Sequence, residues 1–288
     1  MQLSKYNKPL LFYGIAFAVP WLCWLAILFL LTGCSTIKET YTEERKQLLE
    51  RNKISEKRIF SNEAVEHLPE PIKKHLSVAN YMDTPVPINA DVYWAESYLK
   101  LSPEKEWGKL QTIQFNSVAP VSRIAYMKFS SMPVAARDIY KDGYGEMNGK
   151  LINLFNVVFD NSKETAQSAL ITAFCEFFLV PGYLLASNVE WEYLNERAVQ
   201  ATLTDNGIMV SGIFYFDENG LFSHFETYDR YYSTGKNSYK KVKFSAVIDS
   251  YKNQGDLKIP EKVRIIWHLP EGDFEYYKGI IDKIEFNV

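Results

Sequence analysis

Short segments in which apolar and polar residues alternate fill most of the chain from Asn89 to its end. A period of two places successive side chains on opposite faces of a β-strand. Two pairs, Asn206-Gly207 and Asn219-Gly220, separate such segments and are typical of tight hairpin turns. The pattern therefore predicts a large antiparallel sheet of about ten strands, built from consecutive hairpins.

One long apolar segment, SKETAQSALITAFCEFFLV over residues 162–180, interrupts the strand pattern. Ser162 is a typical helix N-cap, large apolar residues follow at helical spacing, and Pro181-Gly182 ends the segment. A helix that is apolar on nearly every side must be covered by other parts of the protein. We therefore expect an α+β fold in which a large curved antiparallel sheet packs on one long helix.

The N-terminal residues have the pattern of a membrane or signal helix. Lys5 and Lys8 precede an uncharged apolar run from Leu10 to Leu31, which is long enough to cross a bilayer core. The run ends in LTGCS at residues 31–35, which resembles the lipobox of bacterial lipoproteins. In that family the cysteine, here Cys34, is lipidated and becomes the mature N-terminus. Small residues before it leave the backbone open to a protease.

Two alternatives to a cleaved lipoprotein signal are open. The apolar run exceeds the roughly 7 to 15 residues of a signal peptide, so the segment from Leu10 to Leu31 is alternatively a retained membrane helix. Basic residues are also more numerous after the run than before it, which would place the rest of the chain in the cytoplasm. We expect a domain in the bacterial cell envelope, outside the cytoplasm, tethered through a lipid on Cys34 or through the helix.

The remaining chain divides into a charged segment and a domain. Residues 34–60 are rich in Glu, Lys and Arg, a composition that predicts a solvated helix or stalk. The expected division is a signal peptide or membrane anchor over 1–33, a charged stalk or linker over 34–60, and a single α+β domain over 61–288.

Charge and cysteine content exclude several function classes. With 32 Lys and Arg against 35 Asp and Glu, the formal net charge of -3 offers no long-range attraction for nucleic acid. Cys23, Cys34 and Cys175 lie far apart and form no CxxC pair, so neither a disulfide framework nor a metal site is expected. The sequence contains no nucleophile elbow, HExxH motif, P-loop or dinucleotide fingerprint. We therefore expect no cofactor, and the absence of these motifs argues against the common enzymatic chemistries.

An ordered set of motifs resembles an uncharacterised bacterial family that pairs a membrane segment with one domain of unknown function. The motifs are LPEP at 68–71, GYGEM at 143–147, E-x-F-x-x-P at 176–181, RY at 230–231 and WHLPEGDF at 267–274. The resemblance covers roughly residues 64–287 and implies a single unit tethered to a membrane. The matching positions include Glu176, Trp191, Arg230, Trp267 and Gly272. By analogy, the architecture is similar to curved-sheet carriers of the bacterial envelope, which hold acyl chains of lipoproteins or lipids.

Glu176 is the charged residue with the most informative surroundings. It interrupts the apolar sequence FCEFF, and a carboxylate in such surroundings needs a cation or a raised pKa. Arg230 is our candidate partner, with Arg123 and Arg137 as further candidates. The pair either fixes how the helix docks on the sheet or lies in a site that binds a ligand head group.

A second candidate cluster lies near the C-terminus. His268, Glu271 and Asp273 come together at a tight turn, and general acid/base chemistry uses such residues. The same sequence equally describes a hairpin whose carboxylates cap backbone amides.

Aromatic residues, with 19 Tyr, 18 Phe and 6 Trp, predict either a cavity lining or the filling of a large β-domain. We expect the domain to bind a hydrophobic or amphipathic ligand, a lipid or acyl chain, in the concave sheet. The candidate ligand-binding residues are Glu176, Arg230, Trp191, Trp267 and His268. The alternatives are a hydrolase using Glu176 or the His268 cluster, and an envelope assembly or interaction factor without enzymatic activity.

Overall fold

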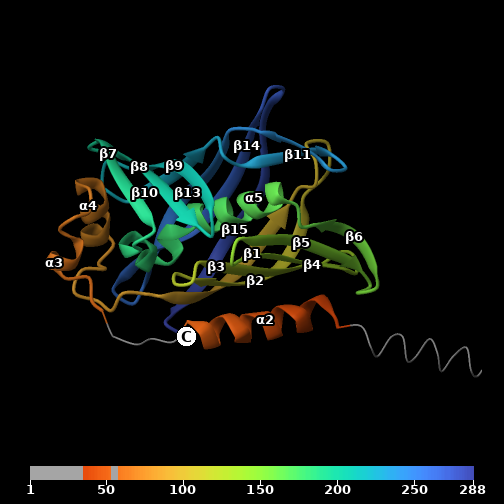
Figure 1. The fold of residues 1–288 in the computed structure, drawn as a ribbon, viewed down its shortest axis with the longest axis horizontal. Coiled ribbons are helices and arrows are strands. Elements are labelled where there is room, and N and C mark those ends of the chain that lie inside the picture. Colours follow the sequence, from red (N-terminus) through yellow and green to blue (C-terminus); the bar gives the residue numbers. More distant parts are fainter. Residues whose placement is uncertain (1–34, 53–57) are drawn as a thin grey trace, which may run out of the picture. The chain divides into compact units, whose positions relative to one another are not determined.

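Thirteen antiparallel strands form one continuous sheet, and two further strands pair with each other (Figure 1). The structure, a computed structural model, describes residues 35–52 and 58–288. The strands of the first half are β1 Asn89–Leu99, β2 Gly108–Ser117, β3 Ser122–Phe129, β4 Val134–Lys141, β5 Tyr144–Leu151 and β6 Phe155–Asp160. Those of the second half are β7 Val189–Asn195, β8 Ala198–Asp205, β9 Ile208–Phe216, β10 Phe222–Thr227, β13 Phe244–Gln254, β14 Leu257–Leu269 and β15 Gly272–Phe286. The separate pair is β11 Tyr231–Gly235 and β12 Ser238–Lys241.

The sheet consists of two meanders joined through the first and last strands. Its order is β6-β5-β4-β3-β2-β1-β15-β14-β13-β10-β9-β8-β7. At the junction Ala90 of β1 lies opposite Phe286 of β15, and Leu99 lies opposite Tyr277. The two edge strands, β6 and β7, are therefore consecutive in sequence but lie at opposite edges of the sheet.

The helices are short. They are α2 Ile37–Arg51, α3 Asn62–Val65, α4 Glu70–Val78 and α5 Lys163–Cys175, followed by the 3-10 turns η1 Phe177–Leu179 and η2 Pro181–Leu185. Ser61 and Ser162 are N-caps, and their hydroxyls accept hydrogen bonds from Ala64 N and Thr165 N. Among the described residues, no helix combines the length and the apolar character needed to cross a bilayer. The predicted membrane segment and Cys34 lie outside these residues.

The expected fold class is wrong in its proportions. The sequence predicts about ten strands on one long helix, whereas residues 35–52 and 58–288 are mostly β, with thirteen strands in one sheet and only short helices. The expected helix over 162–180 ends at Cys175, and Glu176 adopts φ -93° and ψ 10° before a 3-10 turn begins. The edge strands β6 and β7 expose most of their residues, so they show no continuous buried face of the kind that marks an internal strand.

Helix α5 crosses one face of the sheet, which we call the inner face (Figure 1). The segment α5–η1–η2 carries the chain from edge strand β6 to edge strand β7. A Cβ on Gly145 of β5 would lie 2.5 Å from Ala166 Cα, so a glycine at this position lets the α5 backbone pack directly on the strand.

Helix α2 packs on the opposite, outer face of β2, β3 and β4. Its buried residues Tyr41 and Leu48 contact Phe115, Ile124 and Ile139, one from each of these strands. Further contacts are ion pairs of Arg45 with Asp91, Glu44 with Arg137 and Arg51 with Asp142. The charged segment expected as a solvated helix or stalk thus contains a helix that covers part of the sheet. Three buried apolar positions among many Glu, Lys and Arg residues are too few for a sequence pattern to reveal the buried face.

Candidate functional site

A cavity of about 550 Å³ lies between α5 and the inner face of the sheet. Most of its wall is aliphatic or thioether, and examples are Leu110, Met127, Ala136, Met147, Ile248 and Ile265. Polar groups are few, which is the composition of sites for small apolar or amphipathic molecules. Its volume also falls within the range of about 300 to 1,000 Å³ that such sites occupy.

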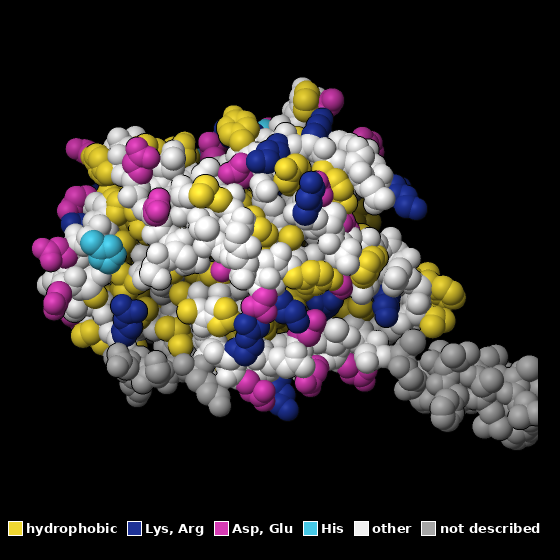
Figure 2. Space-filling view, viewed as in Figure 1, with side chains coloured by type: hydrophobic (Ala, Val, Ile, Leu, Met, Phe, Trp, Pro, Cys, Tyr) yellow, Lys and Arg dark blue, Asp and Glu magenta, His cyan; other side chains and the backbone are white. Residues whose placement is uncertain are grey.

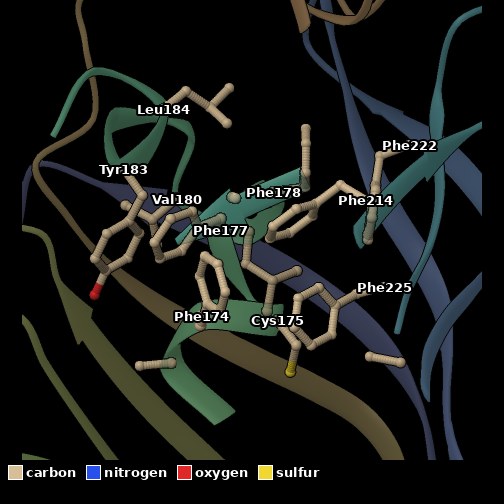
Figure 3. Packing of buried hydrophobic residues seen from close by; sticks show 14 of the residues in the cluster. Phe174, Cys175, Phe177, Phe178, Val180, Tyr183, Leu184, Phe214, Phe222 and Phe225 are labelled. Carbon is tan, nitrogen blue, oxygen red and sulfur yellow. The ribbon is translucent and has the colours of Figure 1, made fainter. Parts of the chain in front are cut away.

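Helix α5 and the turn after it have two different faces. Phe174, Phe177 and Phe178 pack with aromatic residues of β9 and β10, and the ring centroids of Phe178 and Phe222 are 4.1 Å apart (Figure 3). Thr172, Cys175, Glu176 and Leu179 line the cavity. One face therefore closes a solid aromatic core, and the other covers an open space.

The aromatic residues expected at a cavity wall divide between these two regions. Phe214 and Phe216 belong to the closed core, where they are 0% and 4% exposed. Tyr276 and Tyr277 line the cavity. Alternation along a strand indicates that a residue faces inward, but it does not indicate whether the space there is filled.

Glu176 accepts three hydrogen bonds at one carboxylate oxygen. Oε2 lies 2.8 Å from Gln114 Nε2, 2.9 Å from Asn116 Nδ2 and 2.8 Å from Arg123 Nε. The predicted cation exists, but it is Arg123 rather than Arg230. Arg137, the third candidate, lies on the outer face and pairs with Glu44 of α2 and Glu146.

Arg123 bridges two carboxylates at the cavity wall. Its Nη1 donates to Asp138 Oδ2 at 2.7 Å, in addition to the bond from Nε to Glu176. Burial opposes the charged guanidinium, but the carboxylates of Glu176 and Asp138 outweigh it and raise the pKa of Arg123 above its ordinary value. Burial, together with the Glu176 carboxylate, raises the pKa of the Cys175 thiol to about 12, so this thiol is not a nucleophile at neutral pH.

Arg230 lines the same cavity without a carboxylate partner within the described part of the chain. Its Nη1 donates to Ser168 O at 3.1 Å and to Thr172 Oγ1 at 2.5 Å, both on α5. Its guanidinium lies 4.4 Å from the ring centroid of Phe244 and 5.5 Å from that of Trp267. Contacts with rings and neutral oxygens hold this cation in place, but they leave its charge unneutralised.

Two buried donors at the cavity wall lack an acceptor among the residues that the structure describes. They are Arg230 Nε and Trp94 Nε1, and both residues line the cavity. Buried N–H groups are nearly always hydrogen-bonded in folded proteins, so each such exception calls for an explanation.

The exposed part of the cavity wall lies on β6 and on the β1–β2 and β3–β4 turns. Four apolar residues line the cavity and are also exposed, with exposed fractions of 66% for Leu101, 43% for Met132, 55% for Val157 and 41% for Val158. These residues form the mouth of the cavity.

Trp191 and Trp267 do not line the cavity. Trp191 packs on the aromatic core, 5.6 Å from the Phe214 ring, and its Nε1 donates to Leu184 O at 3.2 Å. Trp267 is 6% exposed and lies under the Arg230 guanidinium, so it supports a wall residue.

His268 lies in a separate hydrogen-bonded chain. Its Nδ1 is 2.7 Å from Asp273 Oδ1, and its Nε2 is 2.7 Å from Ser245 Oγ. Glu271 lies exposed in the adjacent turn. The connectivity is that of a Ser-His-Asp triad, but Ser245 is 3% exposed and does not line the cavity. Ser245 carries no sequence motif that would have pointed to it.

Three residues of the site, Gln114, Asn116 and Trp94, were not predicted from the sequence. A signal for the first two existed, because they are polar residues at alternate positions of a strand and flank the apolar Phe115. Within residues 35–52 and 58–288, no group of three His, Cys, Asp or Glu side chains is placed to hold a metal ion.

Comparison with known proteins identifies the family. No curated protein matches the chain. The fold is similar to that of a DUF1329 family protein from Desulfovibrio piger ATCC 29098, with 9% identity, a TM-score of 0.41, and coverage of 76% of this chain and 95% of that one. It is also similar to a LolA superfamily protein from Nitrosomonas europaea, with 9% identity, a TM-score of 0.42, and coverage of 76% and 92%. Both likenesses are distant, and no conclusion about function rests on them. Residues 58–279 match the profile of a family of unknown function, DUF6544, and the chain belongs to that family.

Proposed function

We propose that the domain binds a hydrophobic or amphipathic ligand, a lipid or acyl chain, in the cavity between α5 and the inner face, without transforming it. One observation carries the proposal. A largely apolar cavity of about 550 Å³ has in its wall a guanidinium, Arg230, that has no carboxylate partner among the described residues. The closed aromatic core beside it supports the same conclusion, because the rings there pack in direct contact whereas this neighbouring space stays open.

The apolar wall supplies affinity for a hydrocarbon chain. Each buried methylene contributes about 0.8 kcal/mol, so ten buried methylenes contribute about 8 kcal/mol before the costs of association. The mouth at Leu101, Met132, Val157 and Val158 is apolar as well, so a hydrocarbon chain meets no charged barrier from these residues on entry.

Arg230 supplies selectivity for the ligand's head group. Its guanidinium has no carboxylate partner and its Nε has no acceptor within the described part of the chain, so the complementary head group carries acceptor oxygens and a negative charge. A carboxylate or phosphate ester has both properties. Glu176 does not take this part, because its carboxylate already pairs with Arg123.

The domain acts, on this proposal, at a membrane of the bacterial envelope. The uncharged run from Leu10 to Leu31 and the lipobox-like sequence ending at Cys34 support a tether through a lipid or a retained helix. A tether keeps a lipid-binding domain close to its source of ligand.

Lipid analysis of the purified domain tests the proposal. Residues 35–288 contain the compact unit Ile37–Val288 and are suitable for extraction and mass spectrometry. We expect a reproducible acidic lipid or fatty acid in the wild type. Arg230→Met reduces its amount about 10-fold or more, because a hydrogen bond to a charged group contributes about 1.5–3 kcal/mol. Ala136→Phe, which places a ring inside the cavity, removes it.

The matched control is Met209→Phe, which adds a ring at a position that is 67% exposed and outside the cavity wall. It should retain the wild-type lipid content. Equal lipid content in Arg230→Met, Ala136→Phe and wild type would contradict the proposal. If wild type hydrolyses an acyl ester and Ser245→Ala does not, the domain is a hydrolase and the binding proposal is wrong.

A further inference from the structure

The β5–β6 hairpin exposes large apolar side chains at its tip and along its edge. The exposed fractions are 55% for Ile152, 59% for Phe155, 55% for Val157 and 52% for Phe159. Figure 2 shows hydrophobic side chains gathered at the end of the molecule where Figure 1 places β6. Edge strands usually carry charged residues that prevent pairing, and contiguous apolar patches mark interaction sites. This edge therefore has the composition of a contact surface.

The tip of the hairpin contains an isoleucine in a conformation that isoleucine disfavours. Ile152 has φ 49° and is followed by Asn153 with φ 59°. Glycine or asparagine is usual at such positions, and a β-branched residue there is a genuine outlier. The side chain recovers little through packing within the domain, because it is 55% exposed. Contact of the Ile152 side chain with an apolar surface outside the domain would offset the cost of this backbone conformation.

Chain connectivity ties this tip to the predicted anchor. The backbone N–H of Ile37, the first residue of α2, donates to Asn153 Oδ1 at 3.4 Å. Ile37 follows Leu31 by six residues and Cys34 by three. A chain spans at most about 3.5 Å per residue, so the start of α2 is within about 20 Å of the end of the apolar run and about 10 Å of Cys34.

The hairpin also borders the mouth of the cavity. Val157 and Val158 of β6 both line the cavity and are exposed. Each methylene that leaves an apolar phase for water costs about 0.8 kcal/mol, so a mouth that meets the bilayer lets an acyl chain enter without that cost.

We infer that the β5–β6 hairpin inserts its apolar tip into the bilayer that holds the anchor, and that it turns the cavity mouth toward this bilayer. The inference rests on the membrane tether proposed above. The bilayer is the occupant that the short connection from Leu31 to Ile37 favours, since this connection keeps the tip at the surface. Pairing of β6 with a second copy of the chain is the competing occupant, and the test distinguishes the two.

Photo-crosslinking in vesicles tests the insertion with the full chain. The full-length protein is reconstituted into vesicles of phosphatidylethanolamine and phosphatidylglycerol, and the vesicle-bound fraction is isolated by flotation. A benzophenone amino acid replaces Phe155 in one sample. In the matched control it replaces Tyr193, an aromatic residue that is 52% exposed on β7, the opposite edge strand. After irradiation, intact mass measurement detects lipid adducts and protein dimers.

We expect lipid adducts from position 155 at least 10-fold above those from position 193. Equal adducts at both positions, or none at 155, would overturn the inference while leaving the ligand proposal intact. A protein dimer crosslinked at 155 would assign the surface to a second copy. If the full chain does not float with the vesicles, the proposed tether is wrong, and so is the inference that rests on it. Arg230→Met with the probe at 155 should crosslink like wild type, because the ligand head group and the hairpin act separately.

Discussion

Replacement of Glu176 tests whether its buried ion pair with Arg123 holds the C-terminal end of α5 against the sheet. In Glu176→Ala, Gln114 and Asn116 each lose an acceptor, and Arg123 retains only Asp138. The side chains of Glu176 and Arg123 are 15% and 11% exposed, so solvent replaces these bonds poorly. Removing one partner of a buried pair costs about 3–5 kcal/mol.

That loss is large on the scale of the whole domain. Domains are stable by about 5–15 kcal/mol, and for one of this size each kcal/mol moves the melting temperature by about 2–4 °C. Glu176→Ala should therefore lower the melting temperature by about 6–20 °C. Asp138→Asn should cost less, because Arg123 keeps its bond to Glu176.

Urea and thermal unfolding followed by circular dichroism measure the effect. Glu285→Gln is the control, because Glu285 pairs with Lys283 at the surface, with exposed fractions of 44% and 47%, and its loss should leave the midpoint unchanged. If Glu176→Ala unfolds within about 1 kcal/mol of wild type and yet loses its lipid, the structural role is refuted and Glu176 belongs to ligand recognition.

Two further predictions concern packing and pH. Gly145→Val should lower stability by about 1–3 kcal/mol and reduce lipid content, because a Cβ there meets Ala166 Cα at 2.5 Å. Gly235→Val, where nothing lies within 4 Å of an added Cβ, is the control, and equal melting temperatures would contradict the close approach of α5. Burial lowers the pKa of His75 to about 3, and its Nδ1 accepts a hydrogen bond from Phe222 N at 3.1 Å. The unfolded chain therefore binds a proton that the folded chain excludes, and stability falls as pH drops from about 6.5 toward 3, by up to about 1.4 kcal/mol per unit. In His75→Leu the midpoint of urea unfolding should depend less on pH between about 6.5 and 3. An unchanged dependence would show that other groups cause the loss of stability.

Local signals in the sequence were sufficient for several elements. The Ser162 cap and the Asn206-Gly207 turn depend on residues within a few positions of each other, and the structure contains both. Expected strands such as the one at residues 208–216 follow from alternation alone. The short edge strands and the buried face of α2 required knowledge of what lies next to them, which a single sequence pattern does not carry.

The site divides in the same way. Desolvation required that Glu176 have a partner, and the requirement held. Whether Arg123 or Arg230 pairs with Glu176 depended on strand register across more than fifty residues. The arginine that lies beside Glu176 is Arg123, whereas Arg230 bonds to Ser168 of α5. The existence of the cavity depended on which aromatic side chains fill the core and which only line its wall, and a sequence pattern does not distinguish the two.

The pairing of β1 with β15 has a consequence for biogenesis. The strand that completes the seam between the two meanders is β15, the last of the thirteen in sequence order. Until it emerges from the ribosome, each half keeps an open edge with unpaired amides and carbonyls, exposed to any neighbouring nascent strand. A chain that terminates before β15 therefore forms two separate half-sheets in place of a slightly shortened protein.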